Sequence, residues 1–210
     1  MIVNIPYFEN NNNGKQCMQV AMKCVLKYFL NKDFSLDKLD KLTGRKNNFW
    51  TYTFQIVPVL YDLGLHLKYY SKESLELFLQ WEWFIRQHYW KDADKILKFT
   101  DMPTVLKATE KVLKYDVFEK RKLSIDDIEG YIKQGHVPMV VIDNNVILGK
   151  NDFYQGHFVV VTGFDKEHIY FHESGPVNPE PNKKVKKSLF EKAFNVDGTD
   201  NDCVVVCGVR

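Results

Sequence analysis

Apolar residues at helical spacing dominate the first two-thirds of the chain. The segment from Cys17 to Leu30 contains neither glycine nor proline, and one face of it carries Cys17, Val20, Ala21, Cys24, Val25 and Tyr28. This period of about 3.6 residues predicts an amphipathic helix. A second helix is expected after Ser35, a favourable N-cap residue, and should end at Gly44. A third is expected from Gln55 to Leu63.

The next segment combines strand signals with a long helical pattern. The run LHLKYY, residues 65–70, is typical of a short strand. From Ser71 to Trp90 the sequence predicts one long helix, whose many aromatic residues we interpret as core or packing groups. A further helix is expected from Asp101 to about Lys114, and YDVFEKR, residues 115–121, is a second strand candidate.

The pattern changes at Ser124. The run SIDDIEGYIKQG, residues 124–135, has a Ser-x-x-Asp start and a glycine stop, which is typical of a capped amphipathic helix. The runs that follow are rich in β-branched residues and lie at 137–142, 157–164, 169–174 and 202–209, with a short helix from Ser188 to about Phe194. We therefore expect an α+β fold, with a helical N-terminal lobe at about 1–122 and a largely antiparallel C-terminal sheet at about 123–210.

Length and composition favour a single domain over the whole chain, residues 1–210. With 45% hydrophobic content, 210 residues can form one well-packed core. The 29 basic and 27 acidic side chains nearly cancel, so we expect neither a nucleic-acid partner nor binding to a membrane. The sequence has no apolar run of the about 20 residues that a membrane span needs, and no signal-peptide pattern. A cytoplasmic location is expected.

The four cysteines have the spacing of neither a disulfide framework nor a zinc site. We expect Cys24, Cys203 and Cys207 to be small buried side chains, as most free cysteines are. Cys17 differs because it stands between the polar run NNNNGKQ, residues 10–16, and the start of a predicted helix. Unpaired backbone N–H groups in the first turn of a helix favour a thiolate over a thiol. The position of Cys17 therefore allows either a packed side chain or a reactive thiol.

Among the six histidines, His157 has the position that favours chemistry, because it begins an apolar strand at the end of a long polar loop. His168 and His172 have no partners at metal-ligand spacing, so no metal site is expected. The next strand offers Glu173 as a partner for His157 if the turn between the two strands has an odd number of residues. An even number would bring His172 to the face of His157 instead.

These residues together resemble a known family. The chain has a Pro-Tyr dipeptide near its start, a polar loop, a cysteine that opens a helix, and downstream GHFVVVTGF, residues 156–164, followed by an acidic residue and Gly-Pro. This order is similar to that of the bacteriocin-processing, double-glycine-type cysteine peptidases of the papain-like superfamily. The resemblance covers most of the chain and implies a papain-like cysteine peptidase fold.

The resemblance also implies roles for individual residues. Cys17 corresponds to the nucleophile, His157 to the general base, and Glu173 to the residue that orients the imidazole. The family has a glutamine shortly before its cysteine, for the oxyanion hole, and the corresponding position is Asn11. Asn10 or Gln16 takes this role if the loop is shifted.

Three positions depart from the family pattern. The cysteine is followed by Met18 and Gln19 instead of Gly-Pro, the oxyanion glutamine is an asparagine, and the usual aspartate is a glutamate. The last two replacements keep the chemical type of the side chain.

The implied activity is cleavage of a peptide or amide bond through a covalent acyl-enzyme, without a cofactor or a metal. One alternative keeps the fold but transfers an acyl group between small molecules. A second alternative is an inactive relative that binds a peptide or protein in the inherited cleft. A third is a structural domain in which Cys17 is simply buried. Fast alkylation of Cys17 separates the enzyme hypotheses from the structural one.

Overall fold

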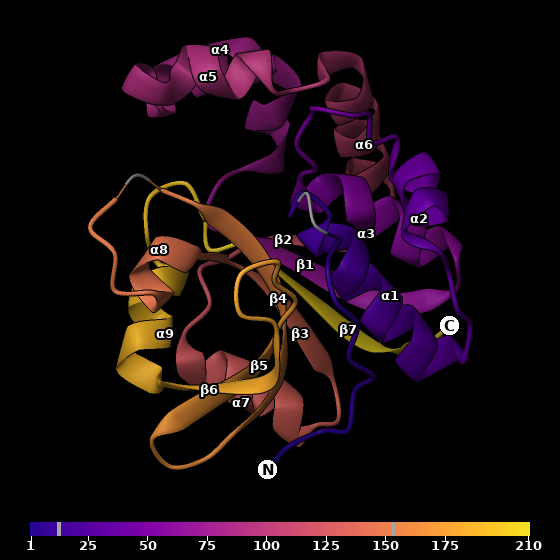
Figure 1. The fold of residues 1–210 in the computed structure, drawn as a ribbon. Helices are drawn as coiled ribbons and strands as arrows, with labels where there is room; N and C mark the ends of the chain where they lie inside the picture. The colour runs from indigo at the N-terminus through magenta and orange to yellow at the C-terminus, as the bar shows by residue number, and fades with distance from the viewer. Residues whose placement is uncertain (12–13, 153) are drawn as a thin grey trace.

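The structure is a computed structural model that describes residues 1–11, 14–152 and 154–210. Within these ranges, seven strands form one sheet in the order β2-β1-β7-β3-β4-β5-β6. Strands β1 and β2 are parallel, whereas all other neighbours are antiparallel. Helices cover both faces of the sheet (Figure 1). The predicted α+β class is therefore confirmed.

The strands are β1 (Leu65–Ser71), β2 (Phe118–Lys120), β3 (Val137–Asp143), β4 (Gly156–Phe164), β5 (His168–Glu173), β6 (Glu180–Lys186) and β7 (Cys203–Val209). The helices are α1 (Cys17–Leu30), α2 (Leu36–Thr43), α3 (Thr53–Asp62), α4 (Trp81–His88), α5 (Ala93–Lys98), α6 (Met102–Lys114), α7 (Ile125–Lys133), α8 (Asn144–Ile147) and α9 (Lys187–Phe194), with 3-10 helices at Leu75–Gln80 and Trp90–Asp92. No helix in the described ranges is long and apolar enough to cross a membrane.

Two hydrophobic cores lie on opposite faces of the sheet. Helices α1, α2, α3 and α6 pack on one face, and α7, α8 and α9 pack on the other (Figure 1). Strand β4 contributes to both, because Phe158 and Val160 belong to the first core and Val159 and Val161 to the second. This alternation is why the β4 segment appears in the sequence as a continuous apolar run.

Several predicted elements form because local signals and tertiary packing agree. The Ser35 side chain accepts a hydrogen bond from the backbone N–H of Lys38, and Gly44 ends α2 in the left-handed region. Ser124 and Asp127 form the capping box that was predicted for α7. The predicted helices at 17–30, 55–63 and 101–114 are also confirmed, with shifts of one or two residues at their ends.

The prediction of one long helix from Ser71 to Trp90 is wrong. Ser71 ends strand β1, where it is fully buried and its hydroxyl donates to the carbonyl of Asp200 at 3.2 Å. A 3-10 helix and α4 follow separately, since sheet pairing overrides the helical pattern at the start of the segment. The aromatic residues of this segment are not all packing groups. Trp81 is buried as expected, but Trp90 is 83% exposed.

Strand β6 was not predicted. Its sequence, EPNKKVK, is mostly polar, and only Val185 among its side chains is buried. The strand lies at the edge of the sheet, where it pairs with β5 alone. At the other side of the sheet, β1 pairs with β7, so the part of the chain before residue 123 supplies strands as well as helices. The extent of the domain, residues 1–210, stays a prediction.

A bulge sets the register between β4 and β5. Phe164 lies opposite Ile169, so the turn contains four residues, 165–168, an even number. The register then shifts between Val161 and Gly163, which leaves Thr162 as an extra residue on β4. This extra residue shifts the pairing by one, so the β5 side chains that share the face of His157 are not those that an even turn alone would place there. Farther along, Val160 lies opposite His172, the same register that an odd turn without a bulge would produce.

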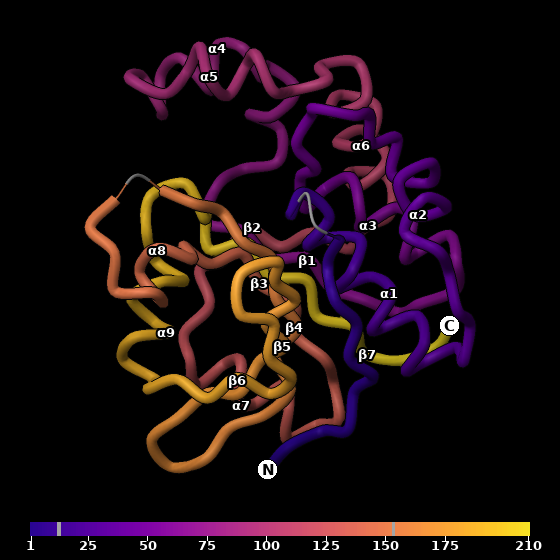
Figure 2. The backbone as a smooth tube through the Cα atoms, in the orientation of Figure 1, coloured from indigo at the N-terminus to yellow at the C-terminus, as the bar shows by residue number. Residues whose placement is uncertain are grey.

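The N-terminal segment packs along this bulge and then runs toward the start of α1 (Figure 2). The backbone N–H of Val3 donates to the carbonyl of Thr162 at 2.7 Å, and Ile2 forms a bridge with Gly163. Farther along, Tyr7 donates its hydroxyl to the carbonyl of Glu173 at 3.0 Å. The segment therefore covers the bulged part of β4 and ends beside the strand that carries Glu173.

We expect Gly163→Ala to lower the free energy of unfolding by about 1–3 kcal/mol, because a methyl group at this position would overlap the backbone of Met1 and Ile2. Gly130→Ala is the matched control, since a methyl group there meets nothing within 4 Å. That change removes a glycine from helix α7 and should stabilise the fold by about 0.5–1 kcal/mol. Urea unfolding of both variants measures the difference, and equal midpoints would contradict the packing described for the N-terminal segment.

Candidate active site

Cys17 is the first residue of helix α1, as the sequence predicted. Its side chain is half-buried and lies in contact with the ring of His157 from strand β4. Burial raises the pKa of the Cys17 thiol, but the hydrogen bond with His157, the charge of that ring, and backbone hydrogen bonds from Phe158 and Met18 outweigh it. The net pKa lies below the ordinary value for cysteine. The start of the helix and the strand therefore both favour the thiolate.

His157 and Glu173 form a buried pair. The Nε2 atom of His157 lies 2.8 Å from Oε1 of Glu173, and their side chains are only 9% and 4% exposed. Because Nε2 faces the carboxylate, Nδ1 is the ring nitrogen left for Cys17. Burial lowers the pKa of His157, whereas the hydrogen bonds and charges of Cys17 and Glu173 raise it, to about 10 overall. The pair therefore favours an imidazolium next to a thiolate.

The Glu173 carboxylate has a second hydrogen-bond partner. Its Oε1 atom also accepts the backbone N–H of Gly175 at 2.9 Å. Burial raises the pKa of this carboxyl group, but the hydrogen bond and charge of His157 and the N–H of Gly175 bring it below the ordinary value. The extra methylene of glutamate, relative to the aspartate of the peptidase pattern, is thus accommodated with both hydrogen bonds formed. The predicted proximity of His157 and Glu173 is present in the structure.

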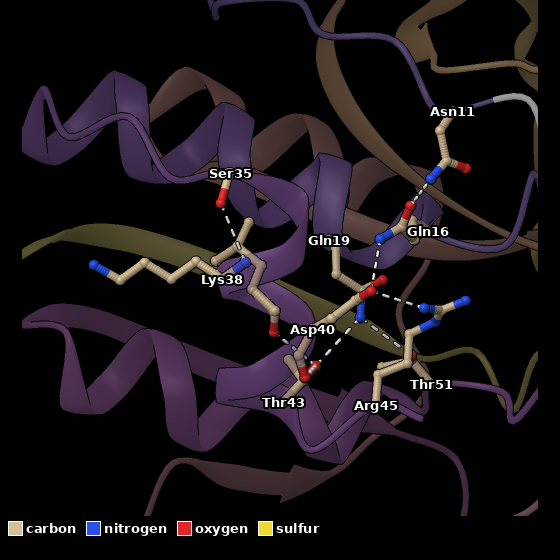
Figure 3. Close-up of polar contacts among 10 residues, drawn as sticks. Asn11, Gln16, Gln19, Ser35, Lys38, Asp40, Thr43, Arg45 and Thr51 are labelled. Carbon is tan, nitrogen blue, oxygen red and sulfur yellow. Dashed lines mark hydrogen bonds and ion pairs between the residues drawn. The ribbon is translucent and has the colours of Figure 1, made fainter. Parts of the chain in front are cut away.

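The three amide side chains proposed for the oxyanion hole lie in different surroundings. Gln16 is buried, and its Nε2 donates to Oδ2 of Asp40 at 2.7 Å (Figure 3). Asn11 is exposed and donates its Nδ2 to Oε1 of Gln16. Asn10 donates its backbone N–H to the carbonyl of Ser174 at 2.7 Å. Gln16 therefore points into the helical layer, and Asn11 stands at the surface end of the same chain of hydrogen bonds.

The other three thiols have different chemistry. Cys24 and Cys203 are buried, as expected, and burial raises the pKa of Cys24 to about 12 and that of Cys203 well above its ordinary value. Cys207 was predicted to be buried as well, but its side chain is half-buried. It is the extra residue of a bulge where Val206 and Gly208 pair with neighbouring residues of β1. Burial raises the pKa of Cys207 as well.

His168 and His172, the pair considered for a metal site, have structural partners. His168 contacts Oδ1 of Asp165 through Nδ1 at 3.0 Å. His172 donates from Nε2 to the carbonyl of Ile5 at 3.0 Å and accepts the backbone N–H of Asn182 at Nδ1. Among the described residues, no group of three or more histidine, cysteine, aspartate or glutamate side chains is arranged to hold a metal ion.

Sequence reasoning missed Asp40 and Arg45, which lie behind the amide side chains. Arg45 donates from Nη1 to Oδ2 of Asp40 at 2.8 Å (Figure 3). A signal was present in the sequence, because Asp40 follows Leu36 and Leu39 at the spacing of the buried face of α2. A largely buried carboxylate requires a partner, and here its partners are Gln16, the residue before α1, and Arg45 in the loop after α2.

Two solved structures share this fold. One is the peptidase domain of Streptococcus ComA, a bifunctional ABC transporter involved in a quorum sensing pathway, with a TM-score of 0.55 at 10% identity over 95% of this chain and 96% of that chain. The other is a double glycine motif protease from an AMS/PCAT transporter in complex with the leader peptide, with a TM-score of 0.50 at 13% identity over 97% and 91%. The resemblance to such peptidases is confirmed for the fold.

A family profile covers nearly the whole chain. The profile described as guanylylate cyclase matches residues 9–206, a range that includes Cys17, His157 and Glu173. This family was not predicted from the sequence, because the cysteine and hairpin motifs resemble those of peptidases. The match and the shared fold are compatible, since one describes the sequence and the other the arrangement of helices and strands. The chain belongs to the guanylylate cyclase family.

Proposed function

We propose that this protein is a thiol hydrolase of the papain-like type, which cleaves a peptide or other amide bond through an acyl-enzyme on Cys17. The observation that carries the proposal is the buried hydrogen bond of 2.8 Å between His157 and Glu173, beside a cysteine whose pKa is lowered. A structural cysteine needs neither a lowered pKa nor a histidine oriented by a carboxylate. A thiol, a base beside it and a carboxylate that orients the base are the arrangement typical of an activated thiol nucleophile.

In the first step, the Cys17 thiolate attacks the carbonyl carbon of the substrate, and the carbonyl electrons move onto oxygen. The resulting oxyanion accepts hydrogen bonds from the backbone N–H of Cys17 and from the side chain of Asn11. Donors at this position typically contribute about 3–4 kcal/mol to the stability of the transition state. Asn11 is preferred over Gln16 because the Gln16 side chain is buried against Asp40.

In the second step, the tetrahedral intermediate collapses and the C–N bond of the substrate breaks. The His157 imidazolium protonates the leaving amine, a role that fits its raised pKa. A water molecule, deprotonated by the now neutral His157, then attacks the thioester, and the acid product leaves with Cys17 restored. Glu173 keeps the imidazole oriented throughout, because its Oε1 is fixed by the N–H of Gly175 as well.

The shared fold supports a peptide as the substrate class. One structure with this fold is a protease bound to its leader peptide. The same acyl-enzyme can also pass its acyl group to an amine or thiol in place of water, which would make the protein an acyltransferase. An inactive relative that binds a peptide or protein without turnover is the alternative from another class.

A second candidate function follows from the family match. The profile that matches residues 9–206 is described as guanylylate cyclase, so cyclisation of a guanosine nucleotide is the competing activity. In that reaction a ribose hydroxyl oxygen attacks the α-phosphorus of the nucleoside triphosphate, the bond to the β-phosphate breaks and pyrophosphate leaves. It does not require an acylated cysteine. Dependence on Cys17 therefore distinguishes the two candidates.

We expect Cys17 to react with iodoacetamide at pH 6 at least about 10-fold faster than the other three cysteines, because an ordinary thiol is mostly protonated at this pH. His157→Ala should remove the excess rate, whereas the control His168→Ala should retain it. Mass spectrometry of tryptic peptides after timed labelling measures each site. If Cys17 reacts in the folded protein no faster than in denaturant, the thiol-enzyme proposal is wrong.

We expect Glu173→Gln to lower the pKa of His157, which is about 10 in the intact site. The substitution preserves an acceptor oxygen but removes the charge that favours the imidazolium, so the ring should lose its proton about 1–2 pH units earlier. NMR titration of the ring resonances measures this change. Glu180→Gln is the control, since Glu180 is exposed and pairs with Glu173 in the sheet. An unchanged titration in Glu173→Gln would contradict the role assigned to this carboxylate.

We expect neither the wild-type protein nor Cys17→Ser to form cyclic GMP from GTP. The assay compares the wild-type protein with Cys17→Ser in the presence of Mg²⁺ or Mn²⁺, with detection by liquid chromatography. Cyclic GMP formed equally by both proteins would favour the second candidate. If only the wild-type protein forms it, Cys17 would act in the cyclase reaction, and the hydrolase mechanism would be wrong.

A further inference from the structure

A chain of hydrogen bonds connects an ion pair in the helical layer to the amide group at the proposed site (Figure 3). Arg45 and Gln16 both donate to Oδ2 of Asp40, at 2.8 Å and 2.7 Å. Gln16 in turn accepts the Nδ2 N–H of Asn11 at its Oε1. The order is therefore Arg45, Asp40, Gln16 and Asn11, and it runs from the loop after α2 to the loop before Cys17.

This ion pair is poorly explained by stability alone. The side chains of Asp40 and Arg45 are 17% and 3% exposed, and transfer of two charges out of water is costly. In the described part of the chain, Oδ1 of Asp40 and Nε of Arg45 have no hydrogen-bond partner, so the pair is not fully compensated. An arrangement that costs stability is retained most readily when it serves a site. This chain of bonds ends at Asn11, the residue to which the proposed function assigns the oxyanion hole.

The charge on Asp40 determines the direction of every bond in the chain. An ionised carboxylate only accepts hydrogen bonds, so Gln16 must turn its NH₂ group toward Asp40 and its oxygen toward Asn11. Asn11 must then turn its own NH₂ group toward Gln16. An NH₂ group has two N–H bonds, and the second bond of Asn11 remains available for another acceptor. Burial raises the pKa of Asp40, and the charge of Arg45 and the hydrogen bonds from Gln16 and Arg45 offset only part of that rise. The contact of 2.8 Å between Nη1 of Arg45 and Oδ2 of Asp40 has the geometry of an ion pair, and this contact supports the ionised state.

We propose that Asp40, paired with Arg45, acts through Gln16 to set which end of the Asn11 amide faces the Cys17 site. Asp40 is then a positioning residue for the oxyanion hole and touches no reacting atom. This inference rests on the proposed function, since it assigns the orientation of an oxyanion donor for acyl transfer. It goes beyond that function by naming residues more than 20 positions from Cys17 in the sequence, because Asp40 and Arg45 bring their charges from α2 and its following loop.

Two reagents separate this role from the reactivity of the thiol. In the reaction with 4-nitrophenyl acetate, a C–S bond forms, the carbonyl oxygen becomes an oxyanion, and the C–O bond breaks to release 4-nitrophenolate. Water then hydrolyses the Cys17 thioester to acetate. Iodoacetamide alkylates the same thiolate by displacement of iodide, and no oxyanion forms. The ratio of the two rates therefore reports the oxyanion hole and is independent of the amount of thiolate.

We expect Asp40→Asn to lower the rate of acylation by 4-nitrophenyl acetate about 10–100-fold while the rate of alkylation stays within twofold. The new amide has nearly the same shape, but it can donate to Oε1 of Gln16 and so reverse both amides. Asn11 would then present its oxygen, which repels an oxyanion. Asp37→Asn is the matched control, since Asp37 is an exposed residue on the same helix. It should leave both rates unchanged.

A double-mutant cycle with Asn11→Ala tests whether Asp40 acts through Asn11. Asn11→Ala should lower acylation by a similar factor, and Asp40→Asn should then add little in that background. Gln16→Met provides a second break in the chain that leaves the ion pair intact, in case Asp40→Asn folds poorly. Thermal unfolding of each variant accompanies the rates.

Three results would overturn the positioning role. These are an unchanged rate ratio in both Asp40→Asn and Gln16→Met, a parallel loss of both rates together with the melting temperature, and additive effects in the double mutant. In each of these cases, fast alkylation of wild-type Cys17 would still support the thiol-hydrolase proposal. Slow alkylation of wild-type Cys17 would reject that proposal first, and the positioning role with it.

Discussion

The register between β4 and β5 is the constraint on which the candidate site depends. His157 and Glu173 are 16 positions apart in the sequence and meet only because the bulge at Thr162 offsets an even turn. The resulting hydrogen bond is buried, so its charges interact strongly, and the Cys17 thiol lies within reach of the same ring. The N-terminal segment covers the bulge, and thereby connects the packing of the first residues to the geometry of the site.

Much of the site could be predicted from the sequence because its signals are local. Cys17 follows a polar loop at the start of an apolar stripe, and His157 opens a strand. The sequence left two registers possible between β4 and β5, one for an odd turn and one for an even turn. It did not predict the bulge, because a buried threonine such as Thr162 is not a reliable signal for one. Asp40 and Arg45 were missed for a related reason: their role depends on the packing of α2 against α1, a contact that no local pattern specifies.

Fold and family describe different properties of this protein. The arrangement of helices and strands is shared with two peptidase domains at 10% and 13% identity, whereas the family profile has a description that names a cyclase. The proposed thiol hydrolase rests on the chemistry of the site. A thiol with a lowered pKa, a carboxylate-oriented imidazole and a directed chain of amides match the needs of acyl transfer, and each makes a separate contribution that can be removed by one substitution.

The bulge also has an evolutionary consequence. A substitution at Glu173 changes one side chain. The deletion of a single residue at Thr162 or in the following turn would instead shift the pairing of β5 with β4 by one residue, and the side chains at the end of β5 would exchange faces of the sheet. His172 would then face His157, and a carboxylate-assisted base would become a pair of imidazoles. Insertions and deletions in this hairpin are therefore the changes most able to convert one chemistry into another, and relatives are best aligned on the bulge before their site residues are compared.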